Sequence, residues 1–466
     1  MNTPQFSRRN ALQLAVGAAA ATFLPLASPI KAFASDGPGR EDRDLARSVA
    51  NAYAFLDTMM DLYAQGSTLR LSQSYTDQEG LLTTAFTYDN AVEINARLAR
   101  RRPEDIARAV VLGKTLLYAQ QTDPAGDNRL RQGYFVDQPD ANGVFLRLVF
   151  DPFFFLNSAV GDLAWAGIAL AQLARATGDR SFLDGAIKLG QWIVTNTFSQ
   201  NGAGGFIFGI GQTQKSTEHN IDAFALFTML ARLTGDASWT ANAQHARTFV
   251  EAMWNPAGGF FWTGTDGGGI TIFTGVIPED VQTWSFLALL DPDFAASIDW
   301  VKTNLASTDT PQSIHSTLTG NVRIRGVSYS DFARRFTGPG SFSGNTPNVD
   351  PDAVWLEGTG HLAAALIARG RKPQDDIDGF FGDLATAAEL LQDIGTAQRQ
   401  VGAGQTGAGR PLPDGQGVVA SSSAFLETGF GFGFHNHRHV GATGWFGIAA
   451  LGANPFQLGL RNRDRD

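Results

Sequence analysis

The sequence predicts an all-α protein: a closed ring of six helical hairpins, an (α/α)6 toroid, with short β-hairpins in its long loops. Three features of the chain predict this fold. Helix-length apolar stretches follow one another in pairs. The two members of a pair differ in how much of their circumference is apolar, and a long Gly-rich connection precedes every second helix.

Twelve stretches repeat apolar residues with the 3.6-residue period of a helix and end at glycine or proline breakers. They are residues 41–65, 87–101, 103–121, 158–177, 180–196, 217–234, 237–254, 278–290, 293–305, 350–369, 373–395 and 439–452.

The clearest pair consists of residues 217–234 and 237–254. The tripeptide Thr-Gly-Asp that begins at Thr234 divides its two helices, and the same tripeptide, beginning at Thr177, divides the preceding pair. Glycine is favoured just beyond the end of a helix because it adopts the left-handed conformation without strain. The repeated tripeptide therefore marks a short turn inside each hairpin.

The two helices of a pair differ in character. Residues 163–170 and 445–451 are apolar nearly all round, so their helices must be buried on every side. Residues 104–108 and 374–378 carry charge along one stripe, as helices with one face in water do. An inner ring of six buried helices inside an outer ring of six amphipathic ones satisfies both patterns.

Each long connection precedes an inner helix, so the long loops should wall a cleft on one face of the ring. Segments 205–208 and 259–262 are expected to form β-hairpins on its rim. The long connections are residues 66–86, 122–157, 197–216, 255–277, 306–349 and 396–438.

Composition narrows the function. The chain has 466 residues, 43% of them apolar, so it can bury a large core. Its formal charge of −9 disfavours nucleic acid, which requires a basic face. It contains no cysteine, which excludes disulfides and thiolate metal sites.

Residues 1–34 are predicted to be a twin-arginine export signal. Arg8 and Arg9 precede an apolar run over 15–26, and Ala32-Phe33-Ala34 matches a small-residue cleavage site. A plain secretory signal or an uncleaved anchor is the alternative. We expect residues 35–466 to form a single catalytic domain, exported by the twin-arginine machinery to the periplasm or beyond, without a stable membrane anchor.

Polar groups gather where the six inner helices should begin. The residues concerned are Tyr88, Asp89 and Asn90; Asp162; Glu218, His219 and Asp222; Glu279, Asp280 and Gln282; Asp350, Asp352, Trp355 and Glu357; and Arg438 and His439. A charge on an otherwise apolar helix is costly unless it is paired or functional. One residue from each inner helix is expected to converge at one mouth of the ring: Asp89, Asp162, Glu218, Asp280, Glu357 and His439.

Helix capping is the simpler explanation for some of these groups. Asp350 suits an N-cap, and Glu279 or Asp280 would interact favourably with a helix dipole. Capping does not explain Asp222 or Glu357, which this pattern places beyond the first turn of buried helices. Paired carboxylates around a cleft instead suit glycosidic chemistry, in which one acid protonates the leaving oxygen and one carboxylate activates water or attacks the sugar.

The alternating histidines His435, His437 and His439 resemble a metal site. No partner ligands with a recognisable spacing accompany them. The sequence therefore predicts neither a metal nor a cofactor.

The chain resembles the six-hairpin (α/α)6-toroid glycoside hydrolases and their relatives, and more narrowly the twin-arginine-exported bacterial members of that superfamily. The segments that carry the resemblance are residues 86–91, 215–222, 278–284, 354–359 and 452–456. The resemblance implies a carbohydrate-active enzyme, with inversion as the expected outcome for a hydrolase. Phosphorylases, lyases and histidine-dependent sugar 2-epimerases share this type of toroid.

The leading hypothesis is a hydrolase acting on a β-glucan or a related oligosaccharide. Glu218 would be the general acid, and Glu357 or Asp280 the base. The expected substrate-binding residues are Asp89, Asn90, Asp162, His219, Asp222, Gln282, Trp284, Trp355 and His439. One alternative is a sugar 2-epimerase in which His219, His361 and His439 move protons, and another is a non-catalytic glycan-binding protein.

Overall fold

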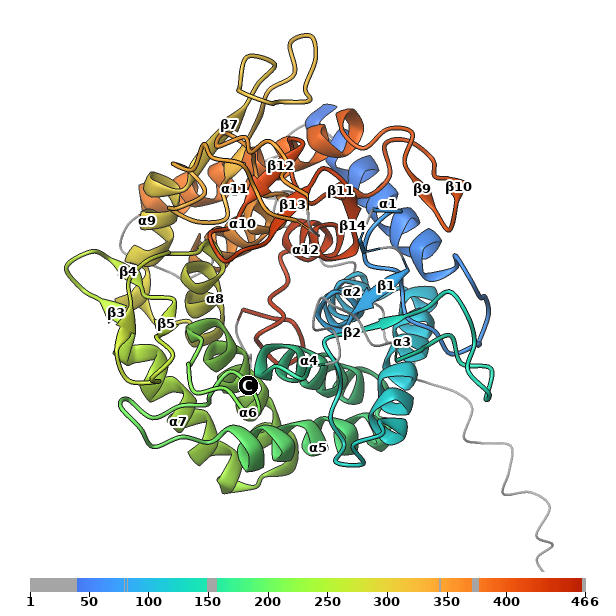
Figure 1. The fold of residues 1–466 in the computed structure, drawn as a ribbon, viewed down its shortest axis with the longest axis vertical. Coiled ribbons are helices and arrows are strands. Elements are labelled where there is room, and N and C mark those ends of the chain that lie inside the picture. Colours follow the sequence, from blue (N-terminus) through green and yellow to red (C-terminus); the bar gives the residue numbers. More distant parts are fainter. Residues whose placement is uncertain are drawn as a thin grey trace, which may run out of the picture.

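The computed structural model describes residues 40–78, 80–81, 83–148, 157–342, 345–370 and 377–462. The predicted export signal, residues 1–34, lies outside them. Within the described residues the chain forms twelve α-helices in two concentric rings, which confirms the predicted toroid (Figure 1). None of the described helices is long and apolar enough to cross a bilayer.

The even-numbered helices form the inner ring and the odd-numbered helices the outer ring. The inner helices are α2 (Thr87–Arg100), α4 (Val160–Thr177), α6 (Thr217–Thr234), α8 (Glu279–Leu289), α10 (Leu356–Gly370) and α12 (Val440–Ala450). The outer helices are α1 (Arg40–Met60), α3 (Pro103–Thr122), α5 (Arg180–Thr197), α7 (Ala237–Ala252), α9 (Ala296–Asn304) and α11 (Ile377–Gln400).

The inner ring is closed. Each inner helix contacts the next, and α12 contacts α2. The sixth hairpin joins distant parts of the chain, because α12 packs against α1. The last helix therefore completes the ring that the first helix begins.

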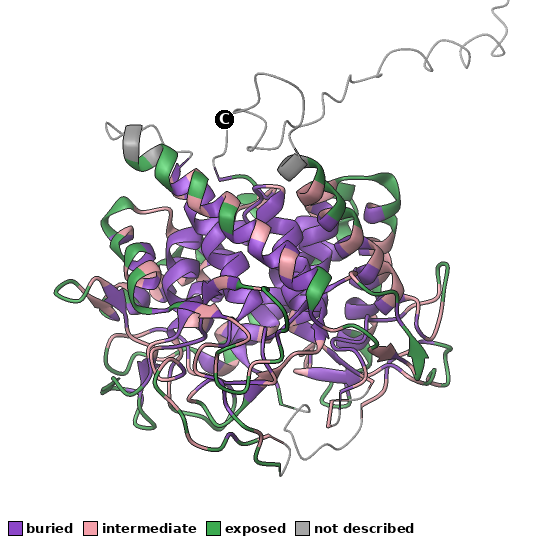
Figure 2. Cartoon of the chain, turned by 90° about the horizontal axis from the view of Figure 1, so that it is seen from above, coloured by how far each residue is buried: buried purple, intermediate pink, exposed green. Residues whose placement is uncertain are grey.

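Burial follows the two predicted classes of helix (Figure 2). Every residue of α12 is buried. The outer helix α7 instead buries a single stripe, which consists of Trp239, Ala243, Ala246, Phe249 and Val250. This spacing is that of one face of an amphipathic helix lying on a core.

The Thr-Gly-Asp tripeptides divide the hairpins as predicted. Gly178 ends α4 and Gly235 ends α6, both in the left-handed conformation. The carboxylates of Asp179 and Asp236 then accept the backbone N–H groups of Ser181 and Ser238 as N-caps of α5 and α7. Each tripeptide thus ends one helix and begins the next.

Three helix boundaries differ from the prediction by five residues or more. Helix α11 ends at Gln400 rather than near residue 395. Helix α1 ends at Met60 rather than near residue 65, because the Arg70 guanidinium donates hydrogen bonds to the Met60 carbonyl and to the carbonyls of Gly66 and Thr68 in the turn that follows. Helix α10 begins at Leu356 rather than at 350. Trp355 is held in an extended conformation by bridges to Val327 and Ser421, so the predicted N-cap Asp350 lies in a loop and Glu357 lies in the first turn.

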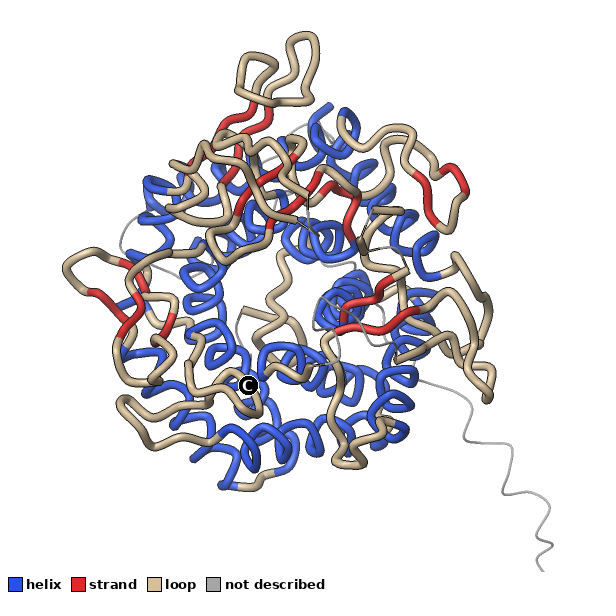
Figure 3. Tube along the Cα trace, viewed as in Figure 1, coloured by secondary structure: helices blue, strands red, loops and turns tan. Residues whose placement is uncertain are grey.

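The long loops gather on one face of the ring and carry short antiparallel strands (Figures 2 and 3). The described residues form seven two-stranded sheets. The pairs are β1 (Thr84–Phe86) with β2 (Gly133–Phe135), β3 (Trp254–Asn255) with β4 (Phe260–Phe261), β5 (Gly264–Thr265) with β6 (Ile272–Phe273), β7 (Ala306–Asp309) with β8 (Ile324–Val327), β9 (Thr406–Gly407) with β10 (Arg410–Pro411), β11 (Val418–Val419) with β14 (Arg438–His439), and β12 (Phe425–Glu427) with β13 (Gly433–His435). The hairpin predicted at 259–262 is present, whereas 205–208 contributes only an isolated bridge between Phe206 and Phe198.

The segment that follows α12 closes the other end of the ring. Asn454 and Gln457 donate hydrogen bonds to the Leu287 carbonyl near the end of α8, and Gln172 of α4 donates to the Pro455 carbonyl. Phe456 enters the ring between the indoles of three inner helices, and its ring centroid lies 5.1 Å from that of Trp165. The loop face is therefore the open end of the ring.

A buried ionic network fastens α1, α2 and α3 together. The Arg97 side chain is fully buried and pairs with Glu93 at 2.6 Å and with Asp57 at 2.8 Å. Asp105 of α3 lies 3.7 Å from the same guanidinium. Asp57 also pairs with Arg108, and Asp105 with Arg100. Removing Arg97 would therefore leave the buried Glu93 as the unpaired carboxylate.

Candidate active site at the open mouth of the ring

The inner helices begin at the loop face, and the same helical position of each one reaches the mouth of the ring. The second residues of α2, α4, α6, α8, α10 and α12 form what we call the upper layer. They are Tyr88, Gly161, Glu218, Asp280, Glu357 and Gly441.

The sixth residue of each inner helix lies one turn deeper on the same side, since residues four apart share a helix face. These residues form the lower layer: Val92, Trp165, Asp222, Trp284, His361 and Trp445. Their rings contact one another, with Trp165 5.1 Å from Trp284 and His361 4.4 Å from Trp445 between centroids. Phe456 lies against the three tryptophans, so the lower layer forms a closed aromatic floor.

The two glycines of the upper layer leave room for neighbouring polar side chains. A Cβ atom on Gly441 would lie 2.7 Å from an Asp89 oxygen and 3.1 Å from a Glu357 oxygen. A Cβ atom on Gly161 would lie 2.6 Å from the His219 ring. Both distances are shorter than van der Waals contact, so these positions require glycine for space.

Glu357 is the centre of the polar network. Tyr88 donates its hydroxyl hydrogen to Glu357 Oε1 at 2.5 Å, and the Trp445 indole N–H donates to the Tyr88 oxygen at 2.9 Å. His361 Nε2 lies 3.7 Å from Glu357 Oε1, and His439 Nδ1 lies 3.4 Å from Glu357 Oε2. Both oxygens of this carboxylate therefore face positive or hydrogen-bonding groups.

Each of these two histidines lies between two carboxylates. His361 Nδ1 is 3.1 Å from Glu279, and His439 Nε2 is 3.0 Å from Asp89. Tyr75 stacks on the His439 ring with a centroid distance of 4.1 Å. Burial by itself would lower the pKa of His361, but the flanking Glu279 and Glu357 raise it to about 9. Burial likewise opposes protonation of His439, whereas Asp89 and Glu357 raise its pKa.

His361 and His439 both favour the ionised form of Glu357, although His439 Nδ1 also accepts the Ala442 backbone N–H. Burial alone would raise the pKa of Glu357, but its interactions with His361, His439 and Tyr88 outweigh burial and lower the pKa. Opposite charges within a few ångströms favour the charged form of both partners. Glu357 is therefore a carboxylate at neutral pH.

The remaining carboxyls of the mouth have raised pKa values. Burial first, and then the charges of Asp280, Asp162 and Glu357, raise the pKa of Glu218 well above its ordinary value. Burial and Glu279 raise the pKa of Asp280 to about 7, and burial with Asp89 raises the pKa of Asp162 to about 8.

Asp222 behaves like its neighbours in the mouth. Its side chain is fully buried one turn below Glu218, and burial together with Glu218 and Asp280 raises its pKa well above the ordinary value. Like charges this close cannot all ionise, so several of these groups hold protons at neutral pH.

The structure brings together the six residues predicted to converge. Asp89, His439 and Glu357 form one chain of contacts, and Glu218, Asp162 and Asp280 are near enough to shift one another's pKa. Tyr88, Asp162 and Glu218 remain partly exposed, whereas His361 and Trp445 of the lower layer have no exposed surface. Solvent thus reaches the upper layer and stops at the floor.

Two predicted substrate-binding residues serve the loop framework instead. The Asn90 side chain bonds both the N–H and the carbonyl of Ser72, and the Gln282 side chain does the same with Phe261. Each is the fourth residue of its inner helix, a position that points away from the ring axis. Asn220, the fourth residue of α6, bonds both backbone groups of Phe206 in the same way, whereas the Thr359 and Thr443 hydroxyls at the fourth positions of α10 and α12 accept the N–H groups of Val327 and Val418.

The other predicted binding residues lie at different depths. Trp284 belongs to the floor, and Trp355 is 4% exposed and packs on Tyr329 at 4.7 Å between centroids. His219 is buried beside Phe208, and burial lowers its pKa to about 4. Trp284 therefore forms part of the floor of the site and Trp355 part of its wall, and neither presents an open ring face for stacking.

Four important neighbours are not among the catalytic and substrate-binding residues of the leading hypothesis. Glu279 and His361 form the pair behind Glu357, Trp445 positions Tyr88, and Tyr329 lies near the mouth, where Asp280 and Glu218 contribute to raising its pKa. A position count would have found two of them. His361 and Trp445 occupy the sixth positions of their helices, four residues after the second-position residues that reach the mouth.

The three alternating histidines go to three different places. His435 Nδ1 contacts the Ala424 carbonyl, His437 Nδ1 contacts the Thr76 hydroxyl, and His439 faces Asp89. Among the described residues, no group of three histidine or carboxylate side chains is arranged to hold a metal ion.

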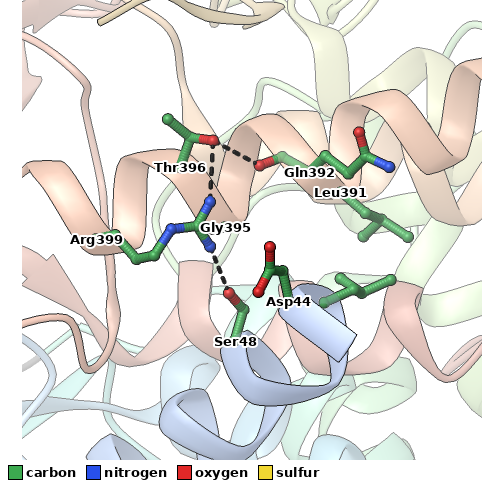
Figure 4. Close-up of a pocket in the computed structure, with 8 residues that line it drawn as sticks. Asp44, Ser48, Leu391, Gln392, Gly395, Thr396 and Arg399 are labelled. Atoms are coloured by element: carbon green, nitrogen blue, oxygen red, sulfur yellow. Dashed lines mark hydrogen bonds between the residues drawn. The ribbon is translucent and has the colours of Figure 1, made fainter. Parts of the chain in front are cut away.

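A small hollow lies elsewhere, between the outer helices α1 and α11 (Figure 4). Arg399 crosses it and donates hydrogen bonds to Ser48 and Thr396. The hollow contains none of the residues predicted for the site, and we assign it no function.

No protein-family model matches the chain, and no curated protein matches it in sequence. Solved structures share its fold. A glycosidase, solved with glucose in a form with one glutamate replaced by alanine, has a TM-score of 0.55 and 12% identity over 89% of this chain and 99% of that chain. A cellobiose 2-epimerase from Bacillus thermoamylovorans has a TM-score of 0.55 and 11% identity over 87% of this chain and 99% of that chain. A family 76 α-mannanase from Bacteroides thetaiotaomicron has a TM-score of 0.53 and 13% identity over 89% of this chain and 98% of that chain. At these identities the likeness establishes the fold alone.

Proposed function

We propose, for a chain with the six-hairpin toroid found in glycosidases and sugar epimerases, that it is an exported glycoside hydrolase acting on a β-glucan or a related oligosaccharide. One observation carries the proposal. Glu218 and Glu357 face the same solvent-reached mouth, and their pKa values are shifted in opposite directions. Pairs of carboxyls whose environments separate their pKa values are the acid and base of glycosidases.

The proposed roles follow from these shifts. The raised pKa of Glu218 favours its protonated form, and the residue is partly exposed, so it is suited to give a proton to the leaving glycosidic oxygen. Glu357 is ionised and takes a proton from the water that attacks the anomeric carbon. Glu218 thus loses one proton and Glu357 gains one in each turnover. Inversion at the anomeric carbon is the expected outcome. Asp280, with a pKa of about 7, is the second candidate for the base.

Residue types in a solved relative support these assignments. Structures of a glycosidase with this fold include forms in which glutamate is replaced by alanine at either of two positions, and one in which tyrosine is replaced by phenylalanine. The polar network here contains the same three residue types: Tyr88, Glu218 and Glu357.

The histidines argue against an epimerase. An isomerase of that type needs a neutral imidazole that can accept a proton from the sugar. His361 and His439 each face carboxylates on both ring nitrogens, and both have raised pKa values. His219 has a lowered pKa but is 7% exposed and packs against Phe208.

The test is turnover on a panel of β-glucan, mannan and cello-oligosaccharides, with the anomer of the first product identified by NMR. We expect Glu218→Gln and Glu357→Gln each to lower kcat by at least about a hundredfold, the lower end of the usual contribution of a general acid or base. His219→Ala should retain activity. Full activity in both glutamine variants together with loss in His219→Ala would support the epimerase, and glycan binding without turnover would support a binding protein.

A further inference from the structure

Two phenylalanine rings project into solvent from the turn between β12 and β13. Phe430 is 39% exposed and Phe432 is 43% exposed. The turn, residues 428–433, has the sequence Thr-Gly-Phe-Gly-Phe-Gly, and we call it the Phe turn. Exposed aromatic rings close together are a costly feature that usually marks a binding surface.

The Phe turn is held firmly. Glu427 is buried, and its Oε1 accepts the N–H groups of Thr428 and Gly429. The Thr428 hydroxyl donates to the Phe432 carbonyl and accepts the Phe430 N–H, and Ser330 donates to the Thr428 carbonyl. Such a turn fixes the directions of both rings before any ligand arrives.

Glycine is needed at two positions of the turn. Gly429 has a φ of 92° and Gly431 a φ of 82°, which only glycine adopts without strain. A Cβ atom on Gly429 would also lie 2.9 Å from the Phe332 ring. The glycines that flank Phe430 therefore build the turn that displays it.

The two rings continue an aromatic wall that begins at the candidate active site. Trp355 lies two residues before Glu357, and Phe434 stacks on it with a centroid distance of 5.9 Å. Phe432 lies 5.8 Å from Phe434, and Tyr329 lies 6.2 Å from Phe430 and 4.7 Å from Trp355. Tyr329 is near enough to Asp280 and Glu218 for their charges to raise its pKa.

We propose that Phe430 and Phe432 form a saccharide-binding subsite beyond the glycosidic bond that is cleaved, so that the substrate is an oligosaccharide long enough to reach the Phe turn. This proposal rests on the proposed function. Pyranose rings present apolar C–H faces that suit aromatic side chains, and the unbroken wall leads from the acidic mouth to both rings. Two rings are too small a surface for a stable protein interface, which buries roughly 800 Å² on each partner.

The test is the dependence of kcat/KM on oligosaccharide length, measured for the wild type and for the double variant Phe430→Ala, Phe432→Ala. We expect about a tenfold loss on long substrates, mainly in KM, and no loss on the shortest substrate that is cleaved. The double variant Phe430→Trp, Phe432→Trp should retain length dependence, whereas the corresponding leucine variant should lose it. Phe381→Ala removes a ring of similar exposure, 47%, from the outer helix α11 and should behave as the wild type.

Failure of this proposal is distinguishable from failure of the proposed function. Equal losses on all substrate lengths, or no loss on any, would overturn the subsite while the wild type still hydrolyses glycans. If the wild type cleaves nothing, calorimetry with long oligosaccharides tests the subsite by binding alone. Weaker binding by the alanine variant than by the wild type supports the subsite without catalysis. No binding by the wild type overturns the subsite. A concentration-dependent dimer that the alanine variant abolishes, with glycan handling unchanged, would also overturn it.

Discussion

Replacing Tyr88 with phenylalanine tests the proposed base. Because the Trp445 N–H donates to the Tyr88 oxygen, the Tyr88 hydrogen must be directed to Glu357. Phenylalanine therefore removes a donor from an ionised carboxylate and leaves the other contacts of Glu357 in place. Glu357 should become easier to protonate, because the removed hydrogen bond favours its charged form.

The size of the effect follows from the energy of that bond. A hydrogen bond to a charged group contributes about 1.5–3 kcal/mol. One pH unit corresponds to about 1.36 kcal/mol. The acidic limb of the kcat/KM profile should therefore move to higher pH by about one to two units in Tyr88→Phe, while the basic limb, assigned to Glu218, stays in place.

The assay is kcat/KM across the pH range for the wild type, Tyr88→Phe and Tyr53→Phe. Tyr53 is a matched control, since its buried hydroxyl donates to the Ala96 carbonyl at 2.6 Å and it is absent from the contacts of Glu357. Both variants should lose stability by about 1–3 kcal/mol, the cost of leaving a buried polar group unsatisfied. An acidic limb that stays fixed in Tyr88→Phe would refute the view that Tyr88 sets the ionisation of the base.

Three further predictions concern stability and export. The pKa of Asp162 is raised from 3.8 to about 8, so between these pH values the folded chain keeps a proton that the unfolded chain releases. This group therefore makes stability fall as the pH rises from 3.8 to about 8. Asp162→Asn should raise the Tm at pH 8 and change it little at pH 4. Arg97→Met leaves the fully buried Glu93 unpaired and should lower the free energy of unfolding by about 3–5 kcal/mol in urea titrations, so a loss below about 1 kcal/mol would contradict the role given to the network. Replacing both Arg8 and Arg9 with lysine should leave the precursor in the cytoplasm in cell fractionation, whereas continued export would indicate a plain secretory signal.

The double ring was predictable from the sequence because its energetic basis is local in the chain. Stretches such as 163–170 contain no charge, so only complete burial suits them, and the Thr-Gly-Asp tripeptides mark where hairpins turn. The α10 boundary was not predictable in this way. Its start depends on Trp355 bridging Val327 and Ser421, contacts between segments distant in the sequence that no local pattern encodes.

The site was predictable by region and less so by residue. Successive helical residues point about 100° apart, and sequence patterns fix helix ends only to within a few residues. Asp280 and Asn90 were therefore both predicted to face the cleft, although one is a second residue that reaches the mouth and the other a fourth residue that holds Ser72. The pairing of Glu279 with His361 was also hidden, because it joins the neighbouring inner helices α8 and α10 through residues that are 82 apart in the sequence.

The choice between hydrolase and isomerase rests on charge placement, since the fold accommodates both chemistries. His361 at the sixth position of α10 lies beneath an upper layer rich in carboxylates, and Glu279 lies behind it. The carboxylates around His361 stabilise its protonated form, so it acts as a fixed positive charge beside Glu357. The same imidazole with neutral neighbours would be free to accept a proton from a sugar. The carboxylates around this histidine therefore favour the proposed hydrolase by fixing its protonation state, and they include Glu357, the residue proposed as the base.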